Sequence, residues 1–431
     1  MNIWTTLLTY LDIILATLYI FICLHREKYD TYLAVVLAIV ISTAYMGTLY
    51  TYSLFFNLDY TLILIFQLGI SFVFTKNLLY FKNLPCSIDY RIICLLWLGL
   101  VLFMIFSKRW GEWDAWAIWT LHAKFLYYPD MWTNMFAKEM NWSHTDYPLL
   151  LPAVTAMFWR SLHGIYAFVP ATIALANFFM ILFILFSGVR QYFLTGVIVS
   201  LLLMADFNFM DICASQYADS HVALMYLLVI LLLTERPKGY IILAGILCSI
   251  ALSIKNEGYI FFMVVFLYIT ISHRHCFTKT SWFLLSALPL FLTAFYFKIT
   301  YAPDNDILSG QSISTLDKFL SPYRYFHIIR FGLETLIAKY YSLFILLLLC
   351  YKYILKIPKE YKIILFTLVA YLLIYLVTPR DLIWHMGTSM KRLFHHLYPA
   401  SIYLLLKGTD LKIFNEILKS KWELINRNVK Q

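Results

Sequence analysis

The chain of 431 residues is 62% hydrophobic and 13% charged, and its formal net charge is +10. A soluble domain carries roughly 25% charged residues, so the composition excludes a water-soluble globular protein and indicates a polytopic membrane protein. The basic residues lie in short loops between apolar segments. Their positive charge therefore indicates how the chain is oriented in the membrane, and it does not predict a nucleic-acid partner.

Apolar windows long enough to cross a bilayer recur along the whole chain. They predict an all-α protein with about 13 transmembrane helices, within a range of about 11 to 13. The first window lacks a basic flank and a small-residue cleavage site, so it is expected to be a retained span. The windows lie near residues 3–24, 31–52, 57–75, 92–107, 165–188, 192–210, 217–234, 239–254, 259–272, 281–301, 333–351, 361–378 and 394–408.

The basic loops test this count, because positive charge marks the cytoplasmic side of a span. The loops all fall on one face only if the segment 147–163, which contains two prolines, does not cross. We therefore expect juxtamembrane helices between the fourth and fifth spans, an external amino terminus and an internal carboxyl terminus. The loops expected inside are 25–28, 76–91, the loop at Arg190, 235–238, 273–279, 352–362 and the segment after Lys407.

The opposite, non-cytoplasmic face then receives most of the ionisable residues that lie in unusual places. Its loops are predicted at 108–147, 211–218, 302–330 and 378–394, with a polar turn around Lys255. The expected organisation is an additional N-terminal transmembrane module at 1–91, a transmembrane core at 92–408 that carries the external loop 108–147, and a basic cytoplasmic tail at 409–431. The seven cysteines are scattered and indicate neither a disulfide framework nor a zinc site.

The loop 108–147 contains half of the 12 tryptophans, and four of these recur every three residues. Trp113 and Trp116 are candidates for stacking on a sugar ring. The alternative is an aromatic belt at the membrane interface.

Asp114 lies between these rings, where a carboxylate at the membrane edge must be paired or used. A partly desolvated Asp can act as a general base. The alternatives are an N-cap and a salt bridge to Lys108 or Arg109.

Other ionisable residues follow in the external loops, and each has a structural alternative. Lys124 lies about 15 Å from Asp114 along a helix, which suits the acidic end of an extended substrate, but it could also cap a helix. His144 and Asp146 precede the extended pair Tyr147-Pro148, where Asp146 could instead cap the next helix.

Three further residues lie at the outer ends of later spans. Asp219 could favour a helix dipole. Lys255 could bind phosphate or form a turn with Glu257. Arg392 belongs to a basic segment on the face where positive charge is disfavoured, which indicates an anionic ligand.

Five segments together resemble a known family. In order they are WDAWAIWTLHAKFLY, DYPLLLP, QYADSHVALMYLL, IKNEGYIFF and VTPRDLIWHMGTSMKRLFHHLYP. They resemble bacterial relatives of the dolichyl-phosphate-mannose–protein mannosyltransferases, in the C-type superfamily of integral-membrane glycosyltransferases. The lipid A aminoarabinose transferases are more distant relatives.

The resemblance implies a C-type fold whose first large external loop carries the catalytic Asp, and a sugar donor linked to a polyprenyl phosphate. By position Asp114 matches this base. Ala115 replaces the family's following Glu, so Glu112, Asp146 or Asp219 is expected to serve as the second acid or acceptor contact.

The remaining site residues follow from the resemblance and the loop analysis together. The donor phosphate is expected to contact Lys124, His144, Lys255 and Arg392. Tyr147 is expected to join Trp113 and Trp116 in stacking on the sugar.

The expected reaction is an inverting transfer of a hexose, such as mannose, to an acceptor hydroxyl. Arg and Lys can stabilise the departing phosphate, so no cofactor is required and a divalent metal is not indicated. The expected partners are the lipid-linked donor, a glycan, lipid or protein acceptor, and membrane lipid, with no nucleic acid. The expected location is the bacterial inner membrane, with the active site facing the periplasm or exterior.

Two other classes of function remain open. A transporter or flippase of lipid-linked sugars would place its charges near the bilayer midplane. A scaffold without activity would not need Asp114, Lys255 and Arg392 together.

Overall fold

The computed structural model describes residues 3–75, 90–189, 191–311 and 314–429, and every regular element in these residues is a helix. Five helices are long and apolar enough to cross a membrane, or up to seven if two bent pairs each count as one span. Five shorter apolar helices of 10–17 residues accompany them. The prediction of an all-α protein is confirmed for the described residues, and these candidate spans are consistent with a polytopic membrane protein. The count of about 13 spans stays a prediction.

The helices follow one another along the chain with short connections. The N-terminal half contains α1 (Ile3–Arg26), α2 (Thr31–Phe55), α3 (Tyr60–Thr75), α4 (Tyr90–Phe106), the π-turn η2 (Ala115–Trp119), α5 (Thr120–Tyr127), the 3-10 turns η3 (Trp132–Phe136) and η4 (Lys138–Ser143), α6 (Leu150–Ser161), α7 (Phe168–Ser187), α8 (Phe193–Ala205) and α9 (Phe207–Ala214). The C-terminal half contains α10 (Ala218–Glu235), α11 (Tyr240–Ile254), α12 (Glu257–Ser272), α13 (Phe277–Thr300), α14 (Asp306–Ser309), α15 (Ser314–Leu320), α16 (Pro322–Lys339), α17 (Tyr341–Cys350), the 3-10 turn η5 (Tyr351–Tyr353), α18 (Tyr361–Val377), α19 (Leu382–Gly408) and α20 (Leu411–Val429).

Two spans predicted as continuous, 192–210 and 333–351, are broken. α8 and α9 bend by 72° at Asp206, and α16 bends by 75° from the helix that follows it. The Asp206 carboxylate accepts hydrogen bonds from the backbone N–H of Phe209 at 3.1 Å and from the hydroxyl of Ser342 at 2.6 Å. The Tyr341 hydroxyl donates to the carbonyl of Ala205. The breaks therefore satisfy each other's freed polar groups, as a break inside a membrane requires.

The predicted external loop 378–394 is also wrong over most of its length. α19 begins at Leu382, where the Asp381 side chain accepts a hydrogen bond from the backbone N–H of Trp384 at 2.8 Å. The predicted loop 211–218 likewise begins inside α9, which ends at Ala214. The ionisable residues of the segment 378–394 are therefore carried mainly by a rigid helix.

Loops that were predicted on the cytoplasmic side contact one another. Lys238 pairs with Glu27 at 2.8 Å, and Arg236 with Glu360 at 3.7 Å. The tail joins this group because Lys407 pairs with Glu235. Residues 76–89 of one basic loop and Arg190 lie outside the described residues.

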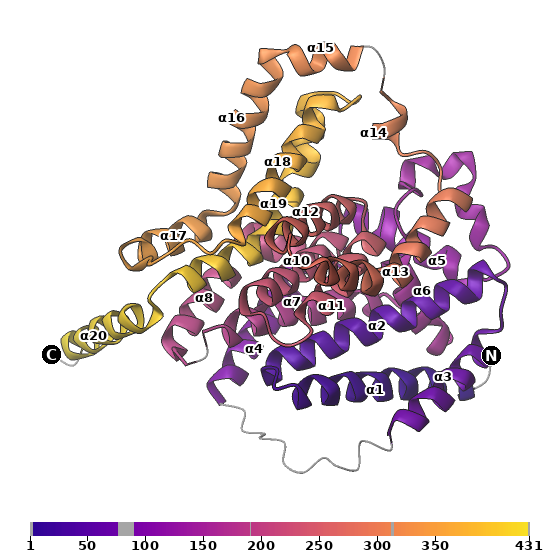
Figure 1. The fold of residues 1–431 in the computed structure, drawn as a ribbon, viewed down its shortest axis with the longest axis horizontal. Coiled ribbons are helices and arrows are strands. Elements are labelled where there is room, and N and C mark those ends of the chain that lie inside the picture. The colour runs from indigo at the N-terminus through magenta and orange to yellow at the C-terminus, as the bar shows by residue number, and fades with distance from the viewer. Residues whose placement is uncertain (1–2, 76–89, 190, 312–313, 430–431) are drawn as a thin grey trace.

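Loops that were predicted on the external side form a second group. Gln216 Nε2 donates to the carbonyl of Lys108 at 2.8 Å, and Lys391 lies 3.7 Å from Asp211. Both ends of α6 contact this group: Asp146, just before α6, binds Asn305, and Arg160 donates to the carbonyl of Tyr127 at 3.0 Å. That α6 does not cross the membrane stays a prediction. The N and C termini lie at opposite ends of the long axis in Figure 1.

The N-terminal helices pack directly on the rest of the protein. The Tyr50 hydroxyl on α2 donates to the carbonyl of Leu126 at 2.6 Å, and the rings of Phe55 and Trp132 lie 5.8 Å apart. Figure 1 shows α1 and α2 side by side along one side of the helical body. The buried core therefore runs across the predicted boundary at residue 91.

A glycine sets the close approach of α11 to α13. A Cβ at Gly245 would lie 2.2 Å from Ser286 Oγ and 2.4 Å from the carbonyl oxygen of Phe283. We expect Gly245→Ala to lower the free energy of unfolding by about 1–3 kcal/mol through overpacking. Thermal unfolding in detergent, followed by tryptophan fluorescence, measures this change.

The control is Gly69→Ala in α3, where a Cβ would meet nothing within 4 Å. This variant should be as stable as the wild type or slightly more stable, because alanine favours a helix. Equal stability of the two variants would contradict the close contact at Gly245.

Candidate active site

An ion pair between Asp114 and Arg392 forms the centre of the candidate site. Arg392 Nη1 on α19 donates to the Asp114 carboxylate, which lies 278 residues earlier in the chain. The two side chains are 18% and 16% exposed. The Asp114 side chain makes no helix-cap hydrogen bond, and its cation is Arg392 and not Lys108 or Arg109. The predicted base and one predicted phosphate ligand thus form a single pair.

A glycine allows the Asp114 loop to lie directly on the segment before α10. Gly111 has φ +73°, and a Cβ there would lie 2.4 Å from the carbonyl oxygen of Ser215. The backbone N–H of Glu112 donates to the same carbonyl at 3.2 Å. The Glu112 carboxylate itself pairs with Lys108. Glu112 is therefore already engaged by a neighbouring cation, which weakens its role as second acid.

A second group of charges lies near the pair, and three of its four members, Lys255, Asp219 and His396, are buried. Lys255 Nζ lies 2.8 Å from Asp219 and 3.0 Å from Glu257, and His396 Nε2 lies 2.8 Å from Asp219. Lys255 is 3% and Asp219 is 1% exposed at the side chain. The structure therefore contains the Lys255–Glu257 turn, which was the alternative to phosphate binding by Lys255. Two carboxylates already neutralise this ammonium group, and Asp219 is not accessible to an acceptor.

Tyr147 connects the buried group to the loops. Its ring stacks on Trp119 at 5.3 Å, contacts the ring of His144 at 5.6 Å and lies 6.0 Å from Lys255 Nζ. Burial, followed by the negative charge of Glu257, raises the pKa of Tyr147 well above its ordinary value. Tyr147 is therefore a neutral phenol at physiological pH. His144, Tyr147 and Lys255 are brought together as predicted for one site.

Asp146 holds the start of this segment in place. Its carboxylate accepts hydrogen bonds from the side-chain amides of Asn256 at 2.7 Å and Asn305 at 2.8 Å. Lys298 donates to its backbone carbonyl and lies 3.7 Å from its carboxylate. The alternative in which Asp146 caps α6 is excluded, because Leu149 is the cap residue. Asp146 is a structural anchor beside Tyr147.

The outer residues of the predicted site divide into two sets. Trp113 and Trp116 are 59% and 42% exposed and contact each other at 4.6 Å, which leaves both a sugar platform and an interfacial belt open. Lys124, in the last turn of α5, lies 5.0 Å above the ring of Trp110. This position matches the helix-end alternative for Lys124.

Sequence reasoning missed several contacts of the site. The Arg392 guanidinium lies 5.6 Å from the ring of Tyr217. Tyr217 belongs to the quoted segment QYADSH, so a signal existed, but nothing in the pattern distinguished its ring. Asn256, Asn305 and Lys298 carry no motif that would relate them to Asp146.

An apolar cavity of about 430 Å³ lies between α1 and α2 on one side and α6, α7, α10 and α11 on the other. Asn177 and His221 contribute polar atoms to its wall. Within the described ranges, the buried Asn177 Nδ2 and His221 Nε2 have no hydrogen-bond partner. His221 Nδ1 lies 3.4 Å from the carbonyl of Tyr217. His221 therefore connects the wall of the cavity to the backbone of Tyr217, whose ring contacts Arg392.

Among the described residues, no group of three or more His, Cys, Asp or Glu side chains could hold a metal ion. Comparison of the chain with protein-family models, curated proteins and solved structures finds no match.

The Asp114–Arg392 pair predicts a coupled effect on stability. Asp114→Asn and Arg392→Gln should each lower the free energy of unfolding by about 1–3 kcal/mol, because each leaves a partly buried charge without its partner. The double variant should lose less than the sum of the two. Denaturant unfolding of the four proteins measures the coupling, and strictly additive losses would contradict the pair.

His122 predicts a pH effect on stability. It is buried, its Nε2 lies 3.1 Å from the Ser143 hydroxyl, and burial lowers its pKa to about 3. The unfolded chain binds a proton on His122 near pH 6.5, so the stability of the folded protein is retained above that pH and falls as the pH decreases toward 3.

His122→Gln should therefore flatten the dependence of the melting temperature on pH between 4 and 7. The melting curves of the wild type and this variant across that range provide the measurement. Parallel pH profiles would show that His122 does not titrate as inferred.

Proposed function

We propose that the protein is an integral-membrane glycosyltransferase of the C type, with about 13 spans, that transfers a hexose such as mannose from a polyprenyl-phosphate donor. One observation carries this proposal: contacts through Tyr217 and His221 connect the Asp114–Arg392 pair to the wall of an apolar cavity. Such a donor combines an anionic phosphate with an isoprenoid tail. A guanidinium and an apolar cavity are the chemical partners of these two parts.

The chemistry of the pair follows from competition for one cation. The donor phosphate and the Asp114 carboxylate are both anions that bind Arg392. When the phosphate takes up the guanidinium, Asp114 is released close to the reacting atoms. The ion pair thus keeps the base engaged until the donor is bound.

The transfer itself is a single displacement. The acceptor hydroxyl oxygen attacks the anomeric carbon, and Asp114 accepts the hydroxyl proton. The bond between the anomeric carbon and the phosphate oxygen breaks, and its electron pair leaves with the polyprenyl phosphate. Arg392 stabilises the charge that develops there, so the step needs no metal ion. The configuration at the anomeric carbon is inverted.

The surrounding residues have supporting roles in this proposal. Tyr147, a neutral phenol, can donate a hydrogen bond to the sugar or phosphate, with His144 beside it. Trp113 and Trp116 offer exposed rings to the sugar or acceptor. Lys255 and Asp219 act through the position of α19. The reaction is placed on the non-cytoplasmic face, in the periplasm or exterior of a bacterial inner membrane.

A second candidate function, transport or flipping of a lipid-linked sugar, is favoured by one residue of the N-terminal helices. Asp12 lies inside α1 with 0% exposure, and neither of its carboxylate oxygens has a hydrogen-bond partner in the described part of the chain. An ionisable residue at membrane depth is typical of a transport path.

The proposed activity is tested with purified protein in detergent and a radiolabelled polyprenyl-phosphate hexose. Asp114→Asn should reduce release and transfer of the label by at least about 100-fold, the contribution typical of a general base. Glu139→Gln is the control, because Glu139 is an exposed acid in the same loop. Its activity should equal that of the wild type.

Two outcomes contradict the proposal. Wild-type activity of Asp114→Asn would show that Asp114 is not the general base. Retained anomeric configuration in the product would exclude a single displacement. Label that crosses a vesicle membrane intact, with Asp12→Asn inactive and Asp114→Asn active, would support the transporter instead.

A further inference from the structure

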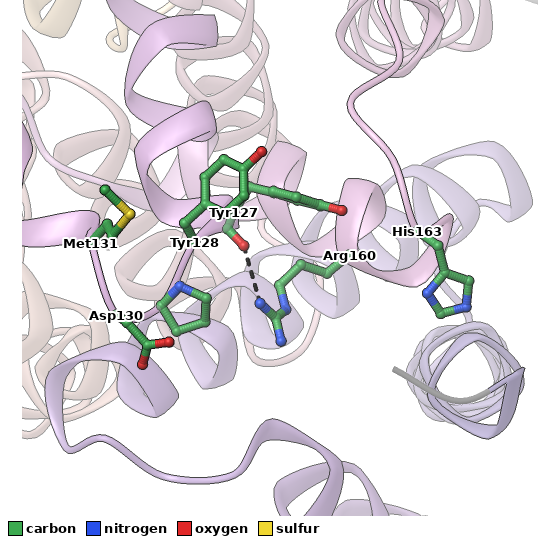
Figure 2. A pocket seen from close by; sticks show the side chains of 7 residues that line it. Tyr127, Tyr128, Asp130, Met131, Arg160 and His163 are labelled. Carbon is green, nitrogen blue, oxygen red and sulfur yellow. Dashed lines mark hydrogen bonds between the residues drawn. The ribbon is translucent and has the colours of Figure 1, made fainter.

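A second hollow lies at the carboxyl end of α6, away from the Asp114–Arg392 pair. Its volume is about 400 Å³. Figure 2 shows the Arg160 side chain reaching from α6 toward Tyr127, with Asp130 beyond it and His163 on the other side. The lining residues come from the end of α5, the turn after it, and the end of α6: Tyr127, Tyr128, Pro129, Asp130, Met131, Arg160 and His163.

Arg160 is held in place but keeps a free donor. Its Nη1 donates to the carbonyl of Tyr127 at 3.0 Å, which fixes the guanidinium. Its Nε is buried and has no hydrogen-bond partner among the residues that the structure describes. The enclosed Nε does not face the hollow, so a ligand there would contact the part of the guanidinium that lines it. A guanidinium held in this way is suited to a carboxylate or phosphate group.

The other side chains point to a carbohydrate and not to a small anion alone. The rings of Tyr127 and Tyr128 meet edge to face at 4.9 Å, and Tyr128 is 51% exposed. Exposed aromatic rings provide apolar faces with a polar hydroxyl. Asp130 adds an acceptor for ligand hydroxyl groups and would repel a free anion. Aromatic rings, one carboxylate and one guanidinium together match a sugar chain that carries acidic groups.

The hollow lies on the same face as the candidate active site. Leu150, at the start of α6, follows Tyr147 closely, and Arg160 lies about 15 Å further along the helix axis. The loop of Asp114 reaches both ends of α6, because Trp110 contacts Trp159 at 6.4 Å. The loop 108–147 therefore contacts α6 near both ends, and the two places lie about one helix length apart.

We propose that this hollow binds an anionic segment of the acceptor glycan, a chain containing uronate or phosphate groups. The role of the ligand as acceptor rests on the proposed glycosyltransferase function. The binding of an acidic glycan rests on Arg160, Asp130 and the two tyrosines alone.

Binding is measured with the full chain in nanodiscs of neutral lipid, using a fluorescently labelled oligogalacturonate as the probe. A neutral malto-oligosaccharide of equal length and inorganic phosphate serve as competitors. The oligogalacturonate should bind, and Arg160→Gln should weaken it at least about tenfold, because a charge-assisted hydrogen bond is lost. Lys138→Gln, an exposed cation in the same loop, should leave the affinity unchanged.

Tyr128→Ala provides a second variant, since Arg160 also binds the backbone and its loss could disturb the fold. This exposed ring should be replaceable without unfolding, and the variant should also bind the probe less tightly. Unchanged affinity in Tyr128→Ala and Arg160→Gln overturns the proposal. Equally tight binding of the neutral chain overturns the anionic class, and competition by inorganic phosphate at equal concentration overturns the glycan.

Two further experiments distinguish a glycan from a lipid headgroup as the ligand, and distinguish glycan binding from the proposed transferase activity. Loss of probe binding in nanodiscs that contain phosphatidylglycerol would assign the hollow to a lipid headgroup, and so overturn the glycan. Asp114→Asn should bind the probe with wild-type affinity while transferring no sugar. If the wild type binds the probe through Arg160 but transfers no sugar, the hollow still binds an acidic glycan. The proposed glycosyltransferase function is then wrong.

Discussion

The buried ammonium group of Lys255 is the constraint on which the architecture of the site depends. It lies between α11 and α12, in a region where an unpaired charge is not tolerated. Asp219 from α10 and Glu257 from α12 neutralise it, and His396 from α19 binds Asp219. Removal of one partner from a buried pair typically costs about 3–5 kcal/mol. The beginnings of two helices and the middle of a third are thus held at one point.

This constraint also places the more accessible chemistry. Arg392 precedes His396 by four residues, so the two side chains lie on one face of α19, one turn apart. The buried group therefore presents the Arg392 guanidinium to the loop that carries Asp114. From the core outward, the site passes from the charges around Lys255 to the mostly buried Asp114–Arg392 pair and then to exposed tryptophan rings.

The sequence predicted the helical character of the protein and the grouping of its loops, because the membrane imposes length and charge rules that act locally along the chain. It could not predict that Asp114 pairs with Arg392, since nothing local relates positions so far apart. It also missed the break at Asp206, because this residue lies inside an apolar run and its partner Ser342 is supplied by a second break. Lys124 was assigned by distance along an ideal helix, and the ring of Trp110 decided its position instead.

The separation of Asp114 and Arg392 by 278 residues determines when the site can form during synthesis of the chain. At synthesis rates of about 5–20 residues per second, roughly 14 to 56 s pass between the appearance of the acid and that of its cation. During that interval the nascent chain already carries its first large loop but has no complete site. Any chemistry that depends on this pair begins only after α19 has been synthesised, so the ribosome finishes most of the chain before the protein can act.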